Sequence, residues 1–564
     1  MTQYQELYQR WLDHCTGELH DELVSISGDD AAIADRFYQT IAFGTAGLRG
    51  VMGAGTNRMN CYTVGLAAYG LASTLENRRV AIGYDCRHHS EEFARHTAAV
   101  LAAAGVEVWL YRELIPTPML SFAVRTLHCG AGVMVTASHN SAEYNGFKCY
   151  GPDGCQMTDE SADAVLAAMN AADLFSVPVV DFDAAMAAGQ IHYIGEDVYE
   201  SYYQAVQTQA LQPELVPGSG LTVLYTPLCG TGNRPVREIL RRLGVPRVDV
   251  VRSQELPDGG FTTCPSPNPE TPSAWNEALA QAGESHPDLI LATDPDADRM
   301  GVSIPDGQGG YQTLTGNEIG CLLLDYLLRT RQAKGALPAR AVAVKSIVTT
   351  PMATAIARAY GCEMRDVLTG FKYIGETILH LEQAGEAGRF VFGFEESSGF
   401  LAGTHARDKD AVVAAMLMCE LAADARVRGQ SLAQELDALY ARYGYYVGQV
   451  DSRVFPGQEG AAEMQAFMES LRRNPPQVLA GLPVTARCDY RARVLTRADG
   501  TEEPITLPRS NVLRFQMGEK VQVIARPSGT EPKLKLYYSA AAETREAATA
   551  IIEALRAEFA RLLG

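Results

Sequence analysis

Short apolar runs rich in Val, Ile and Leu alternate along this chain with longer segments of helical periodicity. Runs of about four to eight such residues bounded by turn residues are typical of buried strands. We therefore predict strands at 132–136, 221–225, 289–293 and 341–347. Strands that alternate with helices in this way indicate α/β units with mainly parallel strands.

The two ends of the chain carry different patterns. Residues 1–15 place charged Glu6, Arg10 and Asp13 among apolar and aromatic residues at helical spacing, which predicts an amphipathic helix and not a signal peptide. At the other end, strand-like runs at 520–525 and 535–539 precede a helical pattern over about 544–563. The last segment is therefore expected to be α+β.

Length and turn-rich stretches predict how the chain divides. At about 150 residues per domain, 564 residues correspond to roughly four domains. Stretches that bear Pro and Gly at 211–220 and 306–310, and a break near 428–444, mark the expected boundaries. The predicted domains are 1–210, 211–310 and 311–435, each α/β with mixed sheets, and 436–564, which is α+β.

The composition excludes several functional classes. With 47% apolar and 20% charged residues the chain is neither disordered nor fibrous. Its richest apolar run, from Ala411 to Cys419, is too short to cross a bilayer. The 12 cysteines include no C-x-x-C pair, which argues against a structural zinc site and a secreted disulfide framework. We therefore expect a cytoplasmic protein.

The net charge of −19 bears on the partners of the protein. This charge repels nucleic acid and anionic membranes, so we expect neither as a partner. A phosphate-bearing ligand has to be held by local cationic groups against the overall field. Clustered Arg and Lys residues are therefore informative.

Ser138 and His139 directly follow the predicted strand 132–136. The carboxyl end of a parallel strand is the usual place for reactive groups in an open α/β sheet. The surrounding residues do not form G-x-S-x-G, so a hydrolase nucleophile elbow is not supported. Ser138 is a candidate nucleophile, and a serine that caps a helix is the alternative.

Three carboxylates at alternate positions, Asp294, Asp296 and Asp298, follow the predicted strand 289–293. An EF-hand loop needs Gly at its sixth position and Glu at its twelfth, where this chain has Arg299 and Pro305, so that route to calcium is rejected. Carboxylate oxygens completed by phosphate and water suit the octahedral preference of Mg²⁺. The alternative is a solvated acidic loop.

Two further loops offer groups that bind sugars and phosphates. Segment 393–400 places two glutamates and two serines between glycines, with a capped helix start as the alternative. The charged segment 405–410 that follows is typical of a solvated surface. Segment 526–533 offers a guanidinium, hydroxyls and glycine-freed N–H groups, as a phosphate-binding turn does. It is not a Walker loop, so nucleotide use is not indicated, and an ordinary Ser-Gly-Thr turn is the alternative.

Taken in this order, the four signatures resemble the α-D-phosphohexomutase superfamily, phosphoglucomutase type. Two shorter motifs support the resemblance, the glycine-rich segment 44–50 and Thr-Gly-Phe-Lys at 369–372. The resemblance implies an α/β fold of four domains, each supplying one loop to a central cleft. One departure is Ser141, which stands where the family usually has Pro after Ser-His-Asn and is expected to loosen that loop while leaving its functional atoms in place.

The resemblance also implies a reaction. Ser138 would carry a phosphoryl group, and Mg²⁺ would be held by Ser138 and the three aspartates. Glucose 1-phosphate and glucose 6-phosphate would be interconverted through glucose 1,6-bisphosphate, with His139 or Lys148 as the general base. The other implied residues are Arg49, Arg299 and Lys409 around the transferring group, and Thr45, Thr369, Gly370, Lys372, Glu395, Ser397, Arg526, Ser528, Gly529 and Thr530 around the sugar and its second phosphate.

The preferred sugar is predicted from the loop Gly-Phe-Glu-Glu-Ser-Ser-Gly, which resembles the glucose-preferring and phosphopentomutase-like branches. We expect small-molecule sugar phosphates as partners. Phosphopentomutase, phosphomannomutase or sugar-bisphosphate synthase activity on the same scaffold is the alternative. From a different class, the alternative is a sugar-phosphate-binding protein without catalysis, against which the intact nucleophile, metal carboxylates and phosphate loop argue.

Overall fold

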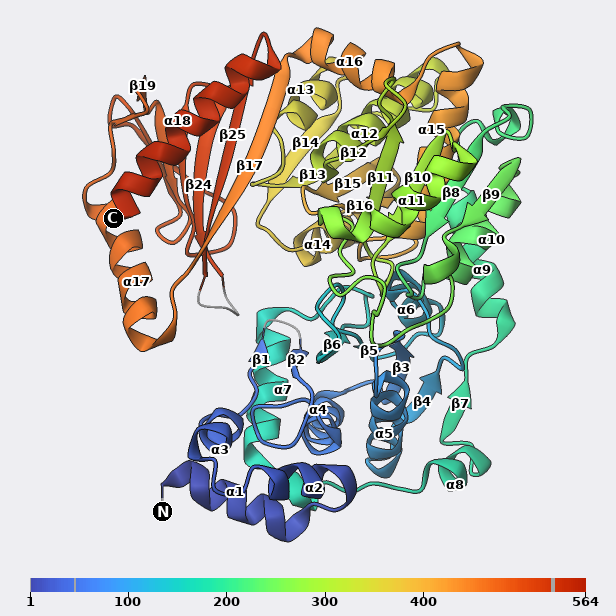
Figure 1. Cartoon of the computed structure of the whole chain (residues 1–564), viewed down its shortest axis with the longest axis vertical. Helices are drawn as coiled ribbons and strands as arrows, with labels where there is room; N and C mark the ends of the chain where they lie inside the picture. The colour runs from blue at the N-terminus through green and yellow to red at the C-terminus, as the bar shows by residue number, and fades with distance from the viewer. Residues whose placement is uncertain (1, 45–46, 529–532, 564) are drawn as a thin grey trace. The chain divides into compact units, whose positions relative to one another are not determined.

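The computed structural model describes residues 2–44, 47–528 and 533–563 (Figure 1). The chain forms two compact units, and it passes between them several times. The first unit consists of Met1–Gly316, Ile374–Gly393 and Ser397–Gly429. The second consists of Asn317–Tyr373, Phe394–Glu396 and Gln430–Gly564.

Three helices begin the first unit and share a small aromatic core. They are α1 (Gln3–His14), α2 (Gly17–Ser25) and α3 (Asp30–Phe37). The Trp11 ring contacts the rings of Phe37 and Tyr62 edge-on, with centroids 5.8 and 5.5 Å apart. The helix predicted over residues 1–15 is confirmed, and its buried Trp11 explains the helical spacing of the apolar residues.

A mixed seven-stranded sheet follows, in the order β1-β2-β6-β5-β3-β4-β7 (Figure 1). Its strands are β1 (Phe43–Gly44), β2 (Gly47–Val51), β3 (Arg79–Tyr84), β4 (Glu107–Leu110), β5 (Ala131–Val135), β6 (Tyr144–Tyr150) and β7 (Ile191–Tyr193). Strand β3 pairs in parallel with β4 and β5, whereas β6 runs antiparallel to β5 and β2. The loops after β3 and β5 therefore leave the sheet at the same edge.

A second mixed sheet has five strands in the order β12-β11-β10-β8-β9. Its strands are β8 (Thr222–Thr226), β9 (Arg247–Val250), β10 (Leu289–Thr293), β11 (Met300–Pro305) and β12 (Tyr311–Leu314). Strand β8 pairs in parallel with β9 and β10, while β10 and β11 form an antiparallel hairpin. The aspartate-rich segment is the turn of this hairpin.

Helices cover the strands of the first unit (Figure 1). They are α4 (Cys61–Thr74), α5 (Ser90–Ala103), α6 (Thr117–Thr126), α7 (Asp159–Ala171), α8 (Phe182–Ala187), α9 (Glu196–Gln207), α10 (Asn233–Leu243), α11 (Asn276–Ser285), α14 (Lys372–Gln383, from Ile374 on) and α15 (Ala411–Val427). Between α14 and α15 lie β15 (Phe390–Glu395) and β16 (Gly399–Ala402). Helix α15 is buried along nearly its whole length, which explains its continuous apolar run.

The second unit combines a parallel strand pair with a larger antiparallel sheet. The pair is β13 (Val342–Ser346) and β14 (Glu363–Val367), accompanied by α12 (Gly316–Ala333), α13 (Met352–Ala359) and α16 (Leu432–Tyr443). The larger sheet has the order β17-β25-β24-β23-β20-β21-β22. Its strands are β17 (Tyr445–Val454), β20 (Ala486–Asp489), β21 (Val494–Arg497), β22 (Glu502–Pro504), β23 (Leu513–Met517), β24 (Val521–Pro527) and β25 (Lys533–Ala542), and α17 (Gly457–Arg473), β18 (Val478–Leu479), β19 (Leu482–Pro483) and α18 (Arg545–Leu563) complete this part.

All the strands predicted from the sequence are confirmed to within a few residues. Segment 289–293 is β10, and segments 132–136, 221–225 and 341–347 correspond to β5, β8 and β13. The C-terminal strands and final helix are β24, β25 and α18. Within the described parts of the chain, none of the helices has the length and apolar character that crossing a membrane requires.

Candidate active site

Ser138 lies in the loop after β5, at the sheet edge where β3 also ends. Its φ of +53° is a left-handed value that a non-glycine residue keeps only when its surroundings hold it there. The Thr136 hydroxyl accepts a hydrogen bond from the Ser138 N–H at 2.8 Å. The side chain is 4% exposed, and its Oγ donates to Asp294 Oδ2 at 2.9 Å. A turn and then β6 follow Ser138, so the helix-cap alternative is wrong.

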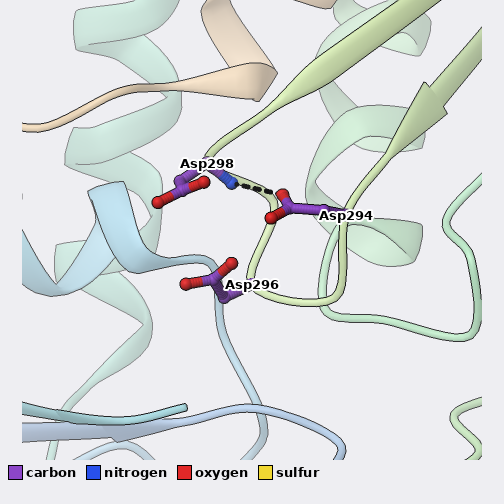
Figure 2. Close-up of side chains that lie close together, drawn as sticks. All are labelled: Asp294, Asp296 and Asp298. Carbon is purple, nitrogen blue, oxygen red and sulfur yellow. Dashed lines mark hydrogen bonds between the residues drawn. The ribbon is translucent and has the colours of Figure 1, made fainter. Parts of the chain in front are cut away.

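The three aspartates share the turn between β10 and β11, and Figure 2 shows their carboxylates gathered on it. Asp294 Oδ1 accepts hydrogen bonds from the N–H groups of Asp298 and Arg299, at 3.1 and 2.9 Å, and so closes the turn. Ala297 within it has a φ of +48°, a second left-handed position. All three aspartates are buried, so the solvated-loop alternative is wrong.

The carboxylate oxygens of this turn suit a cation. One oxygen from each aspartate lies within 4.8 Å of those from the other two. Among the described residues, Asp296 Oδ1 and Asp298 Oδ1 find no hydrogen-bond partner although they are buried. A buried carboxylate oxygen costs free energy unless it is paired or bound to a metal. Because hard cations such as Mg²⁺ prefer oxygen donors, the residues fit the expected metal site.

The pKa values of the three carboxyl groups are driven apart. Burial, together with the charges of the other two aspartates, raises the pKa of Asp294 well above its usual value. Burial and the charge of Asp296 raise the pKa of Asp298. Burial opposes ionisation of Asp296 as well, but the ion pair with Lys148 and a hydrogen bond from Thr117 outweigh it and lower the pKa. Ionisation of Asp294 and Asp298 is therefore opposed by burial and by the neighbouring carboxylates, and a bound cation would relieve that repulsion.

Two lysines neutralise part of this charge. Lys148 on β6 places Nζ 2.8 Å from Asp296 Oδ2. Lys409 places Nζ 3.1 Å from Asp298 Oδ2. Gly399 allows Lys409 to approach, because a Cβ at that position would lie only 2.3 Å from Lys409 Cδ. The sequence-predicted lysines thus contact two of the three aspartates.

Two arginines flank the same region. Arg299 follows the aspartate turn, and its Nη1 donates to the carbonyl oxygen of Ser397 at 2.9 Å. Arg49 on β2 donates from Nη1 to Asn140 Oδ1, in the Ser138 loop, at 3.2 Å. The structure therefore brings the predicted Arg299 and Ser397 together and places Arg49 against the reactive loop.

His139 lies beside the serine. Its Nδ1 is 3.1 Å from Ser138 Oγ. Burial, followed by the charges of Arg299 and Arg49, lowers the pKa of the imidazole well below its usual value. A neutral imidazole can accept a proton, so His139 remains a candidate base, as does Lys148.

Arg87 binds the backbone of the reactive loop, a role that the sequence analysis did not predict. Its Nη2 donates to the carbonyl oxygen of Ser138 at 2.6 Å and also to that of Asn140, and its Nη1 donates to those of Ser141 and Tyr144 at 2.7 and 2.9 Å. The guanidinium is fully buried beside Asp85, 3.3 Å away. These bonds fix the backbone on both sides of Ser141.

Thr117 was also missed. Its hydroxyl donates to Asp296 Oδ2 at 2.9 Å, and its N–H donates to the Asp296 carbonyl oxygen at the same distance. The first residue of α6, in the part of the chain that forms the first sheet, therefore fixes an aspartate that follows a strand of the second sheet.

The sequence did contain a signal for Arg87. This signal was Asp85-x-Arg87 at the carboxyl end of β3, since that end adjoins the end of β5. Nothing in the sequence singles out Thr117.

The charged segment 405–410 corrects one interpretation. We expected a solvated surface, but the segment is buried throughout. Tyr202 and His405 hydrogen-bond the Asp410 carboxylate, which also caps α15. Lys409 additionally contacts Asp408 Oδ1 at 3.0 Å. Partners within the segment and outside it, such as Tyr202, stabilise these buried charges and let the segment present Lys409 to the aspartate turn.

The second unit contains the other group of predicted residues. Glu395 is buried at the end of β15, and its Oε1 accepts a hydrogen bond from the Gly370 N–H at 2.7 Å. Because β15 is a strand, the alternative of a capped helix start is wrong. The neighbouring Thr369 Oγ1 is buried without a hydrogen-bond partner among the described residues, and Lys372 Nζ lies 5.1 Å from the Tyr373 ring centroid. The two predicted sugar-binding motifs in this unit thus meet.

The phosphate-binding turn lies partly within the described residues. Arg526 is the penultimate residue of β24, and its charge opposes the rise in the pKa of Tyr537 that burial causes. The Ser528 N–H donates to the Lys533 carbonyl oxygen at 2.8 Å. The predicted Thr45, Gly529 and Thr530 lie outside the described residues.

Comparison with known proteins decides the family. Residues 40–175, 200–307 and 315–443 match the alpha/beta/alpha domains I, II and III of phosphoglucomutase/phosphomannomutase. A phosphoglucomutase of Staphylococcus haemolyticus is 38% identical over 508 residues, which cover 89% of this chain and 91% of that protein. The chain belongs to the phosphoglucomutase/phosphomannomutase family. The resemblance found in the sequence is thereby confirmed.

Solved structures of phosphoglucomutase/phosphomannomutase relatives share the fold. A phosphomannomutase structure from Thermus thermophilus superposes with a TM-score of 0.67 at 25% identity, covering 93% of this chain and 99% of that one. The Paramecium parafusin structure, a phosphoglucomutase, superposes with a TM-score of 0.69 at 16% identity, covering 93% and 95%. Three α/β/α domains with mixed sheets and a β-rich C-terminal domain with helices confirm the predicted fold class. The residue boundaries of the four domains and the central cleft stay predictions.

Proposed function

We propose that this chain is a magnesium-dependent phosphoglucomutase that interconverts glucose 1-phosphate and glucose 6-phosphate. Ser138 carries the phosphoryl group, and glucose 1,6-bisphosphate is the intermediate. The observation that carries the proposal is the buried Ser138 hydroxyl, held at a left-handed φ with its Oγ 2.9 Å from a buried carboxylate of the aspartate turn. Family membership supports the same assignment.

Phosphoryl transfer needs positioning and charge neutralisation more than covalent help from the protein. In the proposed step, the bond between phosphorus and Ser138 Oγ breaks as a free sugar hydroxyl binds the same phosphorus. The hydroxyl proton passes to His139 or Lys148, and Ser138 Oγ, the leaving group, takes up a proton. In the second half of the cycle Ser138 Oγ gives up that proton as it binds the other phosphorus of the bisphosphate. The sugar oxygen that leaves takes up a proton, and the phosphoserine is restored. Arg49, Arg299 and Lys409 neutralise the charge of the phosphoryl oxygens.

The expected metal site accords with this chemistry. Asp294, Asp296, Asp298 and Ser138 would hold Mg²⁺, which when bound supplies positive charge to a phosphoryl oxygen. Lys148 and Lys409 already contact two of these carboxylates, and they offset the mutual repulsion of the three only in part. The two buried carboxylate oxygens that have no hydrogen bond among the described residues support the assignment.

The remaining predicted ligand-binding residues are proposed to bind the parts of the sugar phosphate that do not react. Glu395, held by the Gly370 N–H, and Ser397 would bind sugar hydroxyls together with Thr369 and Lys372. Arg526, Ser528, Gly529 and Thr530, with Thr45 of the first segment, would bind the second phosphate. Charge-assisted hydrogen bonds from a guanidinium suit that phosphate.

The direct test is a coupled assay of glucose 6-phosphate formation from glucose 1-phosphate. Ser138→Ala should lose nearly all activity while keeping its fold, because the phosphoryl group then has no carrier. Ser141→Ala is the matched control, since within the described part of the chain its hydroxyl donates to the exposed Glu143, and it should keep wild-type activity. Substantial turnover by Ser138→Ala would refute the phosphoserine mechanism.

The preferred sugar is tested by running the assay with glucose, mannose, ribose and glucosamine phosphates. We expect the highest kcat/KM with glucose 1-phosphate. A preference for the pentose phosphate would replace phosphoglucomutase by phosphopentomutase, and a chain that binds these compounds without turnover would be a binding protein.

A further inference from the structure

Residues 3–38, which form α1, α2 and α3, precede the matched family domains, the first of which begins at residue 40. Their polar contacts with the rest of the unit fall mainly on one loop, residues 52–59. That loop joins β2, which carries Arg49, to α4. We propose that this helical segment positions Arg49, and that Glu22 on α2 is the positioning residue through which it acts.

Glu22 connects three parts of the chain. Its Oε2 accepts a hydrogen bond from the Ala54 N–H at 2.8 Å. Its Oε1 accepts two from Arg36 of α3, from Nε at 3.2 Å and from Nη2 at 2.9 Å. One carboxylate therefore ties α2 and α3 to the loop, and it is the only acceptor described for that N–H.

The backbone of α3 and the residues after it complete the attachment. The Arg36 carbonyl oxygen accepts from the Asn57 N–H at 2.9 Å. The Thr56 hydroxyl donates to the Gln39 carbonyl oxygen at 2.7 Å, and the Ile41 N–H donates to that of Thr56 at the same distance. Residues 54, 56 and 57 of the loop are thus bound to α2, to α3 or to the residues that directly follow α3.

Two glycines show how closely the loop fits this segment. Gly53 and Gly55 have φ values of +137° and +128°. A Cβ on Gly53 would lie 2.8 Å from Glu22 Oε1, and a Cβ on Gly55 would lie 2.8 Å from the Arg36 carbonyl oxygen. The loop can approach the helices only because these two positions lack side chains.

The same loop fixes the end of β2. The Met59 N–H donates to the Val51 carbonyl oxygen at 2.9 Å, and the Gly53 N–H donates to that of Met59 at 3.1 Å. Val51 is two residues from Arg49, which pairs with Gly146 of β6 and contacts Asn140 of the Ser138 loop. A displacement at Ala54 would therefore reach the Arg49 guanidinium through a short, hydrogen-bonded piece of backbone.

The proposal rests on the proposed function, in which Arg49 neutralises the transferring phosphoryl group. Its test is a double-mutant cycle in the coupled assay, with Glu22→Ala in the wild-type and Arg49→Ala backgrounds. Glu22→Ala should lower kcat by about 10- to 100-fold, since a displacement of about 1 Å at a reacting group has an effect of that size. In the Arg49→Ala background the same change should lower kcat less than about twofold, because residues that act as one unit are not additive.

Two further variants keep the test decisive. Glu18→Ala removes an exposed carboxylate from the same helix and should leave kcat unchanged. Glu22→Gln retains an acceptor for Ala54 but loses the ion pair with Arg36, so it should give an intermediate kcat and serves if Glu22→Ala does not fold. Wild-type kcat in both Glu22 variants, or equal losses in the two backgrounds, would overturn the proposal. An inactive wild-type enzyme would instead refute the proposed function.

Discussion

Arg87 gives the sharpest test of how the reactive loop is held. Its guanidinium donates to four backbone carbonyl oxygens between Ser138 and Tyr144 and lies beside the buried Asp85. Arg87→Lys keeps a positive charge near Asp85 but has a single ammonium group, which cannot span both sides of the loop. The substitution therefore separates the geometry of the guanidinium from its charge.

The expected magnitude follows from these contacts. A lysine would reach one or two of the carbonyl oxygens, so at least two would lose a charge-assisted hydrogen bond of about 1.5–3 kcal/mol each. Ser138, held at φ +53°, would then relax toward an unstrained conformation. Because misplacing a reacting group by about 1 Å costs about 100-fold, we expect kcat to fall by roughly that factor, with KM changed less than about threefold.

Steady-state kinetics in the coupled assay, beside circular dichroism to confirm the fold, measures this. Arg78→Lys is the matched control, because Arg78 also donates to backbone carbonyl oxygens, but to those of Ala72, Ala104 and Gly105 and not to the Ser138 loop. It should keep wild-type kinetics. If Arg87→Lys kept kcat within about twofold of wild type, the reasoning that Arg87 positions the nucleophile would be refuted.

Other predictions concern the metal and the ligand loops. A strong chelator should abolish turnover, and added Mg²⁺ should restore it. Asp296→Asn should need a higher Mg²⁺ concentration for the same activity. Activity that does not change with chelator would refute the assignment of the three aspartates to a metal site. Since burial raises the pKa of Asp294 and Asp298, the metal-free protein should lose stability as pH rises through those values, so Mg²⁺ should raise the unfolding temperature more at about pH 8 than at about pH 5. Glu395→Ala should lower kcat and flatten the preference between glucose and mannose phosphates, and unchanged ratios would exclude it from specificity. Arg526→Ala should lower kcat/KM by about 10- to 150-fold, partly through KM, and wild-type constants would mean that its loop is only a turn.

The sequence predicted the strands and the reactive segments well because both have local signals. Buried parallel strands read as apolar runs, so 289–293 was recognisable as β10 without reference to the rest of the chain. Ser138 and the three aspartates follow such strands and carry unusual residue patterns. Their burial and their contact across two sheets, as between Ser138 Oγ and Asp294 Oδ2, depend on how the sheets pack and had no local signal.

The residues that hold these loops in place were not predictable in the same way. Arg87 and Glu22 bind backbone groups of loops that lie 32 to 57 positions away, whereas charged residues are usually exposed to solvent. The burial of segment 405–410 was not predicted either. Its charges resemble those of a surface, yet Tyr202, 208 residues from Asp410, satisfies one of them in the interior. Only tertiary packing distinguishes these cases.

The central claim is that Ser138 carries the phosphoryl group that the substrate receives, and one single-turnover measurement tests it directly. Enzyme carrying a radiolabelled phosphoryl group on Ser138 is mixed rapidly with glucose 1-phosphate and Mg²⁺ and is quenched over time. The account predicts that label leaves Ser138 and appears in glucose 1,6-bisphosphate at a rate at least equal to kcat. Label that stays on the protein while glucose 6-phosphate accumulates at the steady-state rate would contradict it.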